Sequence, residues 1–292
     1  MDKKLTVICG DAIEELKKFP DKSVKLIVTD PPYNLSKNYG ISQDNLNFED
    51  YLNFSRKWIA EAVRVLTDDG SIYVFMGMRY ISYIFMILEQ EFKLNFNSWI
   101  TWFYTQGIGK TRGFSPRHED ILFFTKDKKN FTFNLDSVRV PQKFYRSVNN
   151  MRGANPGNVW EFSHTHYCNK NRKNHPTQKP EALFERIILV SSNENDLILD
   201  PFAGSGTSLR VCQQINRKCI GIEINPDYVE MIQQRLSEPF KGFDSIDERM
   251  KRLPNNLNNS EIRSNYIKNH VEWFLKNHTE EIENFNQINL FK

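Results

Sequence analysis

The stretch DLILDPFAGSGT at residues 196–207 decides the fold of this chain. It begins as a short apolar run, typical of a buried strand, and ends in the glycine pair Gly204 and Gly206 just before a helix-like stretch at 208–215. Glycines between a strand and a helix let the backbone approach a bound ligand closely. In open α/β sheets ligands bind outside the carboxyl ends of strands, so we expect a binding site here.

Similar apolar runs recur along the chain, and helix-like stretches lie between several of them. The runs are 5–9, 24–30, 71–76, 98–104, 120–125, 196–200 and 219–224, and the helix-like stretches are 11–19, 48–66, 180–192 and 208–215. Apolar runs without alternation suit parallel strands that are covered on both faces. The alternation therefore predicts an α/β fold with a doubly wound, mostly parallel sheet.

Composition narrows the class of protein. The 292 residues are 39% hydrophobic and 26% charged, which is typical of a globular chain with a full-sized core. No apolar run is long enough to span a membrane, so we expect no membrane partner. Four cysteines without a C-x-x-C pair indicate a reducing cytoplasm. The group His164, His166, Cys168 and His175 fits no common zinc spacing, so we expect no metal.

Charge is distributed unevenly along the chain. Residues 110–179 hold 14 Lys and Arg but only 5 Asp and Glu, although the whole chain carries a net charge of only +3. A polyanion-binding face needs such a basic block, and a solvated surface insertion would look the same. Within it, 126–174 has no sustained period and is predicted to be an inserted recognition region. A catalytic domain would then comprise 1–125 and 175–236, followed by a linker and helical tail at 237–292.

The glycine loop lacks the features of a phosphate-binding loop. A third glycine is missing, and no Gly-Lys-Ser/Thr sequence follows Gly206. About 20 residues beyond the loop, Glu223 ends the next predicted strand, where a carboxylate can accept hydrogen bonds from ribose hydroxyls. The pair predicts an adenosine-containing ligand without a pyrophosphate.

A second motif, Asp30-Pro31-Pro32-Tyr33, follows the apolar run at 24–29. Two adjacent prolines fix two φ angles and remove two backbone donors, which leaves a rigid turn rich in hydrogen-bond acceptors. Asp30 adds a carboxylate and Tyr33 an aromatic face. Acceptors for an amino group beside a flat stacking surface are what a flipped-out adenine requires. The alternative is an ordinary proline-rich turn.

With these motifs in this order, the chain resembles the amino-methylating DNA methyltransferases, in particular the permuted group whose catalytic tetrapeptide precedes the cofactor loop. The resemblance covers roughly residues 5–236. It implies a Rossmann-like methyltransferase fold, S-adenosyl-L-methionine as cofactor, and catalysis by Asp30, Pro31, Pro32 and Tyr33. The residues that it implies for cofactor binding are Asp11, Asp30, Thr177, Lys179, Asp200, Phe202, Ala203, Gly204, Ser205, Gly206, Thr207 and Glu223.

The resemblance also implies a substrate and a mechanism. Asp30 and the Pro31 carbonyl would accept the amino protons of a base flipped over Tyr33, and the nitrogen would attack the methyl group directly. An Asp at the first motif position favours adenine N6 over cytosine N4 in double-stranded DNA. A catalytically silent DNA-binding module, and an enzyme acting on RNA or protein amines, remain alternatives.

The basic block contains the candidates for contacts with DNA phosphates or guanines, which are Lys110, Arg112, Arg117 and Arg139. The family resemblance further implies a bacterial cytoplasmic enzyme with double-stranded DNA as partner. A cognate restriction endonuclease and a homodimer are additional possible partners.

Overall fold

The computed structural model describes residues 4–35, 45–104, 109–140, 153–162 and 178–239, and the following account concerns these residues. Eight strands form one sheet in the order β1-β8-β7-β2-β3-β5-β4-β6. The strands are β1 (Leu5–Cys9), β2 (Val24–Thr29), β3 (Leu66–Met76), β4 (Asn95–Phe103), β5 (His118–Thr125), β6 (Val159–Glu161), β7 (Leu197–Asp200) and β8 (Lys218–Glu223).

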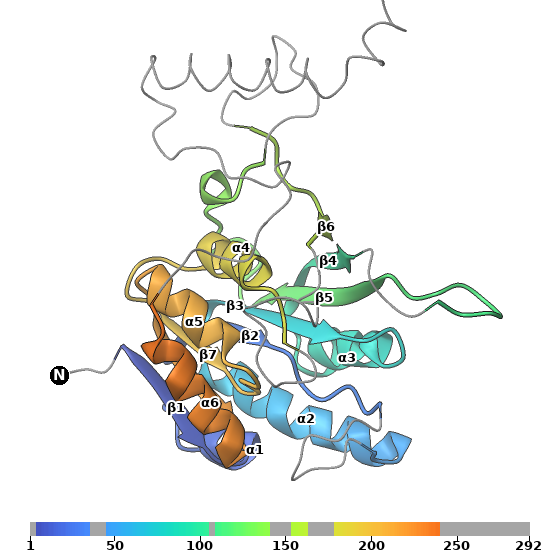
Figure 1. The fold of residues 1–292 in the computed structure, drawn as a ribbon, viewed down its shortest axis with the longest axis horizontal. Helices are drawn as coiled ribbons and strands as arrows, with labels where there is room; N and C mark the ends of the chain where they lie inside the picture. Colours follow the sequence, from blue (N-terminus) through green and yellow to red (C-terminus); the bar gives the residue numbers. More distant parts are fainter. Residues whose placement is uncertain (1–3, 36–44, 105–108, 141–152, 163–177, 240–292) are drawn as a thin grey trace, which may run out of the picture.

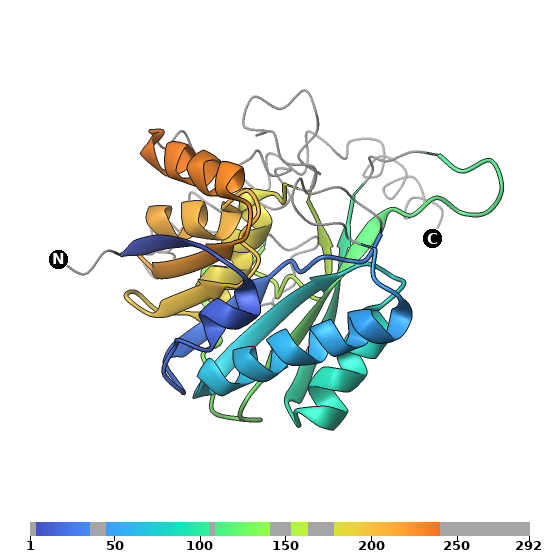
Figure 2. The ribbon, with the colours of Figure 1, turned by 90° about the horizontal axis from the view of Figure 1, so that it is seen from below.

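Helices cover both faces of this sheet. One group, α1 (Ala12–Leu16), α2 (Phe48–Val65) and α3 (Ile81–Met86), lies on one face. The other group, α4 (Glu181–Ser191), α5 (Thr207–Gln214) and α6 (Pro226–Ser237), lies on the opposite face (Figures 1 and 2). A π-helical turn, η1 (Ile87–Glu91), continues α3, and a 3-10 turn, η2 (Leu135–Ser137), precedes β6. The predicted doubly wound, mostly parallel α/β fold is confirmed.

The first strand of the chain, β1, lies at one edge of the sheet, beside β8, the last described strand in the sequence. β1 pairs in parallel with β8, with Leu5 opposite Cys219 and Cys9 opposite Glu223. This is the arrangement that a circular permutation leaves, because a chain break between two neighbouring strands changes connectivity but not their positions. The carboxyl ends of β1, β8, β7 and β2 therefore meet at one edge of the molecule.

The sheet is mostly parallel, as expected, with one strand in the opposite direction. β5 runs antiparallel to both β3 and β4, so the loop between β4 and β5 lies at the same edge as the carboxyl end of β3. The sequence reading also missed β6, α3, η1 and α6. β6 is three residues long, which is too short for its periodicity to be recognised.

The described part of the interval 126–174 packs on the sheet and on α4. Phe133 stacks on Phe123 of β5, and the Asn134 side chain donates to the carbonyl oxygens of Leu189 in α4 and of Ser192 just after it. β6 adds to the sheet beside β4. The domain boundaries stay predictions, and the expected tail beyond Pro239 lies outside the described residues.

Candidate active site

A cavity of about 260 Å³ opens at the carboxyl ends of β1, β2, β7 and β8. This volume is close to the lower end of the roughly 300–1,000 Å³ of small-molecule sites. Its lining includes most of the residues expected at the cofactor, namely Asp11, Asp30, Lys179, Asp200, Phe202, Ala203, Gly204, Ser205, Thr207 and Glu223. The tertiary structure thus brings together segments from four distant parts of the sequence.

The glycine loop between β7 and α5 has a backbone that requires its glycines. Gly204 and Gly206 adopt φ values of 52° and 73°, the left-handed region that residues with a Cβ rarely enter. At Gly206 a Cβ would also lie 2.8 Å from the Ile232 side chain of α6. Glu223 ties down the loop, since its Oε2 accepts a 2.8 Å hydrogen bond from the Gly204 N–H.

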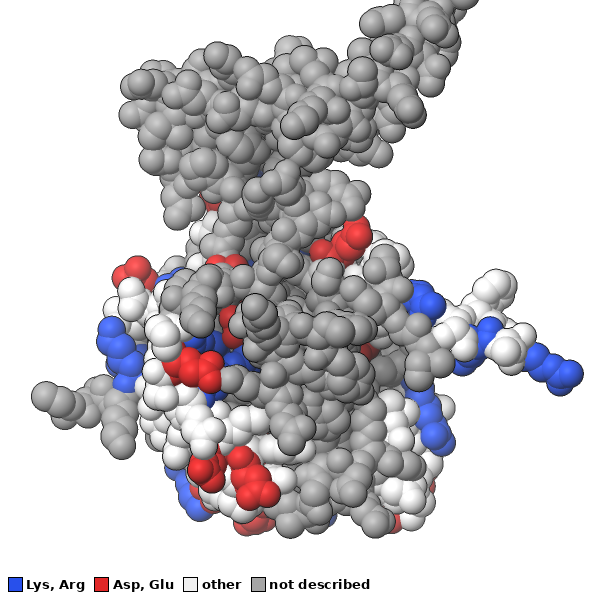
Figure 3. Space-filling view, in the orientation of Figure 1, with Lys and Arg blue, Asp and Glu red and all other residues white. Residues whose placement is uncertain are grey.

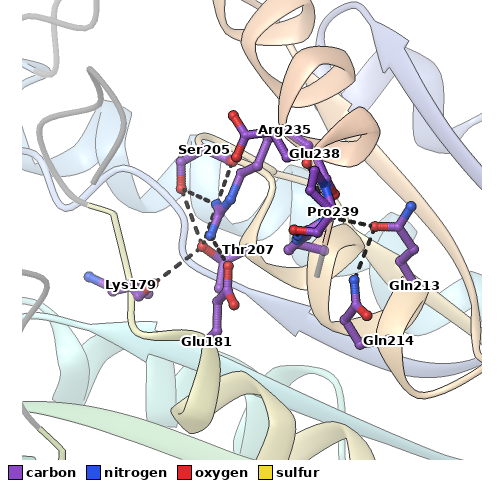
Figure 4. Close-up of polar contacts among 10 residues, drawn as sticks. Lys179, Glu181, Ser205, Thr207, Gln213, Gln214, Arg235, Glu238 and Pro239 are labelled. Atoms are coloured by element: carbon purple, nitrogen blue, oxygen red, sulfur yellow. Dashed lines mark hydrogen bonds and ion pairs between the residues drawn. The ribbon is translucent and has the colours of Figure 1, made fainter. Parts of the chain in front are cut away.

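Figure 4 shows how a buried arginine fixes the same loop from behind. Arg235 of α6 donates to the Ser205 carbonyl oxygen at 2.8 Å and forms a 2.5 Å ion pair with Glu181, the first residue of α4. The side chains of Arg235 and Glu181 are only 3% and 8% exposed. Arg235 also lies 3.3 Å from the Thr207 hydroxyl, which in turn donates to the Lys179 carbonyl oxygen. Sequence reading missed this pair, because neither residue belongs to a recognisable motif.

Asp200 stands at the end of β7, where the loop begins. Its carboxylate accepts hydrogen bonds from the Ser208 hydroxyl at 2.5 Å and from the Phe202 N–H at 3.2 Å. Burial raises the pKa of Asp200 to about 7, although both hydrogen bonds oppose the shift. The Phe202 ring packs edge-on against Trp58 of α2, which anchors the loop to the opposite layer of helices.

The segment Asp30–Tyr33 carries a compact polar cluster that also includes Lys179 and Glu119. The Tyr33 hydroxyl lies 2.6 Å from Asp30 Oδ1 and 3.0 Å from Glu119 Oε2. The Lys179 ammonium lies 2.7 Å from Glu119, 3.2 Å from Asp30 and 3.3 Å from the Tyr33 hydroxyl oxygen. Glu119, at the start of β5, was absent from the sequence prediction because no local motif surrounds it.

Burial and charge act against each other in this cluster. Burial raises the pKa of Asp30, and the nearby Lys179 cation opposes that shift. Burial disfavours the Lys179 ammonium, but the carboxylates of Asp30 and Glu119 outweigh it and raise the pKa of Lys179. Burial likewise raises the pKa of Tyr33 well above its usual value. The cluster therefore holds a neutral phenol and a firmly protonated lysine.

Pro31, Pro32 and Tyr33 lie in a turn that neighbouring side chains hold in place. The Pro32 carbonyl oxygen accepts a 2.8 Å hydrogen bond from the Tyr51 hydroxyl of α2. The next residue, Asn34, has a φ of 55° and exchanges two hydrogen bonds with the Leu46 backbone. Pro32 lines the cavity, whereas the Tyr33 ring lies behind it and is 9% exposed.

Asp11, expected to contact the cofactor adenine, lies at the cavity and caps α1. Its Oδ1 accepts hydrogen bonds from the N–H groups of Ile13 and Glu14. Thr177, also expected at the cofactor, lies outside the described residues, as do His164, His166, Cys168 and His175.

The candidate DNA contacts fall into two environments. Lys110, Arg112 and Arg117 lie on a segment that projects from the body between β4 and β5, where Figure 3 shows basic side chains at the surface. Arg139 is instead engaged within the protein, where it pairs with Asp136 at 2.6 Å and donates to the Gly153 carbonyl oxygen. These contacts give Arg139 a role in holding its own loop.

Comparison with known proteins decides the family. A family model described as DNA methylase, N6_N4_Mtase, matches residues 24–234. The chain belongs to this family. Its relatives include the type II methyltransferase M.HpaI of Haemophilus parainfluenzae, which is 66% identical over 98% of this chain and 90% of its own length. Another is the DNA adenine methyltransferase YhdJ of Escherichia coli K12, which is 41% identical over 79% of this chain and 82% of its own.

Solved structures agree with this assignment. The methyltransferase aligns with the M1.HpyAVI–SAM complex at a TM-score of 0.56 and 27% identity, covering 80% of this chain and 100% of that one. The cytosine-N4-specific PvuII DNA methyltransferase shares the fold at a TM-score of 0.65 and 20% identity, with coverage of 89% and 93%. The expected family and Rossmann-like fold are confirmed, and the family's dependence on S-adenosyl-L-methionine matches the expected cofactor.

None of the helices in the described residues is both long and apolar enough to cross a membrane. Within the same residues, no group of three or more His, Cys, Asp and Glu side chains is arranged to hold a metal ion.

Proposed function

We propose that this DNA methyltransferase transfers a methyl group from S-adenosyl-L-methionine to adenine N6 at a specific site in double-stranded DNA. The observation that carries the proposal is the cluster of Asp30, Tyr33 and Lys179 at the mouth of the cofactor cavity. The 41% identity to a protein named a DNA adenine methyltransferase favours adenine over cytosine. A role in a restriction-modification system follows from the relatives named type II methyltransferases.

The residues of the cavity fit the cofactor. An adenosine needs an apolar slot with a few polar groups at its ribose, and the cavity combines Phe54, Phe202 and Ile222 with the carboxylates of Asp11 and Glu223. Gly204 presents its backbone without a side chain at the cavity wall. When bound there, the cofactor supplies an electrophilic sulfonium methyl group, so positioning of the acceptor nitrogen provides most of the rate enhancement.

The chain's own residues would position the acceptor. Asp30 accepts a hydrogen bond from the exocyclic amino group, which holds the nitrogen lone pair toward the cofactor side of the site. As the nitrogen becomes positively charged in the transition state, the Asp30 carboxylate stabilises it electrostatically. Stacking of the base on Tyr33 would require the ring to become more accessible than its 9% exposure in this structure.

The first test is methyl transfer from labelled cofactor to unmethylated DNA, followed by digestion and nucleoside chromatography. We expect label in N6-methyladenine, and label in N4-methylcytosine would overturn the base assignment while keeping the mechanism. Asp30→Asn should lose at least about a hundredfold in kcat while the Kd for S-adenosyl-L-methionine stays within about twofold. Asp68→Asn, which changes an exposed carboxylate paired with Lys22, is the matched control.

Partners follow from the same proposal. A type II system pairs the methyltransferase with a restriction endonuclease of the same specificity, so we propose such a companion. The proposed homodimer would be tested by sedimentation at the concentration used for the methyl-transfer assay.

A further inference from the structure

The Tyr33 hydroxyl lies between two carboxylates and has only one proton to donate. Its oxygen is 2.6 Å from Asp30 Oδ1 and 3.0 Å from Glu119 Oε2. The phenol stays protonated, because burial raises the pKa of Tyr33 well above its usual value. In this structure both Asp30 oxygens are engaged, Oδ1 by the Tyr33 hydroxyl and Oδ2 by the Lys179 ammonium, so a substrate amino group must displace or share one of these contacts.

We propose that Glu119 is a positioning residue for methyl transfer. When the target amino group binds to the Asp30 carboxylate, Glu119 accepts the hydrogen bond of the Tyr33 hydroxyl and pairs with the Lys179 ammonium. The inference rests on the proposed role of Asp30 as acceptor. Without Glu119, a Tyr33 hydroxyl displaced from Asp30 would be buried with one acceptor fewer, a loss that costs about 1–3 kcal/mol. Glu119 offsets this cost, because its oxygen already lies within hydrogen-bond distance.

The position of Lys179 supports the same role. Its ammonium is closer to Glu119, at 2.7 Å, than to Asp30, at 3.2 Å. Glu119 therefore draws the cation away from Asp30, which leaves more negative charge on the oxygen that faces the substrate nitrogen. Both carboxylates are nearly buried, with side chains 17% and 18% exposed, so these interactions are weakly screened by solvent.

The experiment compares Glu119→Gln, which keeps the shape but removes the charge, with Glu119→Leu, which removes both acceptor and charge. We expect kcat to fall about tenfold and about a hundredfold respectively, with KM for cofactor and DNA within about twofold of the parent. Glu91→Gln, which changes a surface carboxylate paired with Arg56, is the control. Calorimetric binding of S-adenosyl-L-methionine verifies that each variant is folded.

The pH profile separates positioning from a merely structural role. The titratable groups that act on Asp30 among the described residues are Lys179, Glu119, Tyr33 and Asp200, and Tyr104 acts on Glu119. Because the Glu119 charge raises the pKa of Asp30, its removal should move the acid limb of the kcat profile to lower pH. An unchanged kcat in Glu119→Leu, or a lower kcat with an unmoved acid limb in Glu119→Gln, overturns the proposal. Absence of any DNA methylation by the parent protein would instead overturn the proposed function.

A second, independent feature is a fully exposed aromatic side chain on the projection between β4 and β5. Phe114 is 100% exposed, whereas phenylalanine is among the residues most often buried in folded proteins. It lies within the projecting segment 109–117, next to Gly113 with a φ of 89°. The Lys110 N–H donates to the Ser115 hydroxyl at 2.7 Å within this segment.

The surroundings of Phe114 identify its partner as DNA. Segment 109–117 carries Lys110, Arg112 and Arg117 and contains no acidic residue, so it is complementary to a polyanion and not to a membrane interior or a basic surface. Its base adjoins the active site. The Tyr104 N–H donates to the Arg117 carbonyl oxygen at 2.9 Å, and Glu119 of the catalytic cluster follows two residues later.

We infer that Phe114 enters the DNA duplex and stacks on a base pair beside the target. An aromatic side chain stacked on a base contributes about 1–3 kcal/mol, which offsets part of the cost of unpairing the target base. Like the first inference, this one rests on the proposed action on double-stranded DNA.

The test measures kcat/KM for Phe114→Ala on a matched duplex and on a duplex in which the target base is mispaired. We expect a loss of about tenfold to a hundredfold on the matched duplex, restored to within about threefold on the mispaired one, with Phe114→Trp close to the parent. Tyr83→Ala removes another exposed ring, 44% exposed on α3, as control. No loss on the matched duplex, or equal losses on both duplexes, overturns the inference.

Discussion

Arg235 and Glu181, 54 residues apart in the sequence, form a buried ion pair of 2.5 Å behind the glycine loop. The same guanidinium donates to the Ser205 carbonyl oxygen, so one side chain joins α6, the start of α4 and the loop. A charged pair so deeply buried is costly to break, because the remaining partner keeps its desolvation penalty.

Removal of the arginine should therefore loosen the cofactor loop. We expect Arg235→Met to lower the free energy of unfolding by about 3–5 kcal/mol and to weaken S-adenosyl-L-methionine binding. In the double variant Arg235→Met/Glu181→Leu, much of the stability should return, because no buried charge is left unpaired. Urea unfolding measures the stability and calorimetry the binding. Equal losses in the single and double variants would show that the charge pair is not the cause.

Lys179 provides the cation between the two carboxylates of the catalytic cluster. Lys179→Met should leave Asp30 and Glu119 without a counter-ion. Because the Lys179 cation lowers the pKa of Asp30, its loss should raise that pKa, and a protonated Asp30 is a weaker acceptor. We expect kcat to fall at least about a hundredfold, and Lys179→Arg to retain more activity than Lys179→Met. Steady-state kinetics across pH 5–9 measure both effects. Full activity in Lys179→Met would contradict this role.

Gly206 should not tolerate a side chain. Its φ of 73° disfavours alanine, and the new Cβ would lie 2.8 Å from Ile232. We expect Gly206→Ala to lower the free energy of unfolding by about 1–3 kcal/mol and to weaken cofactor binding. Adding Ile232→Ala should relieve the clash but not the backbone strain, and it creates a cavity of its own. A Gly206→Ala protein with parental stability and cofactor affinity would refute this account of the loop.

Asp200 should make stability depend on pH. Its pKa is about 7 in the folded protein against 3.8 as the unperturbed value, so the folded state holds the proton more tightly. The stabilisation is present below about pH 4 and is lost as the pH rises through 7. Relative to the parent, Asp200→Asn should therefore gain stability with rising pH, by up to about 4 kcal/mol between pH 4 and 8. Parallel stability curves in urea titrations at several pH values would contradict the prediction.

Much of the fold was predictable because its signals are local. The apolar runs at 5–9, 24–30 and 196–200 each correspond to a strand whose ends differ from the prediction by at most one residue. The alternation with helices was sufficient to predict a doubly wound sheet. β6 was not predicted, because three residues are too few to show a hydrophobic periodicity, and it pairs in the sheet with β4 alone.

The residues of the candidate site likewise differ in whether the local sequence reveals them. Asp30, Tyr33, Gly204 and Gly206 stand in contiguous motifs, whose residue types and spacing point to their chemistry without any coordinates. Glu119 and Arg235 have no such surroundings in the sequence, since an isolated carboxylate or guanidinium on an element is most often a solvated surface group. Only their burial and their partners distinguish them.

The sequence by itself determined the fold class, the family resemblance and the two motifs, because strand periodicity, glycine at left-handed positions and proline-fixed turns are properties of neighbouring residues. The tertiary structure alone decided that Glu119 and Lys179 share the Tyr33 hydroxyl and that Arg235 holds the glycine loop. These are contacts between residues far apart in the chain. Their energies depend on desolvation and distance, which exist only once the chain has folded.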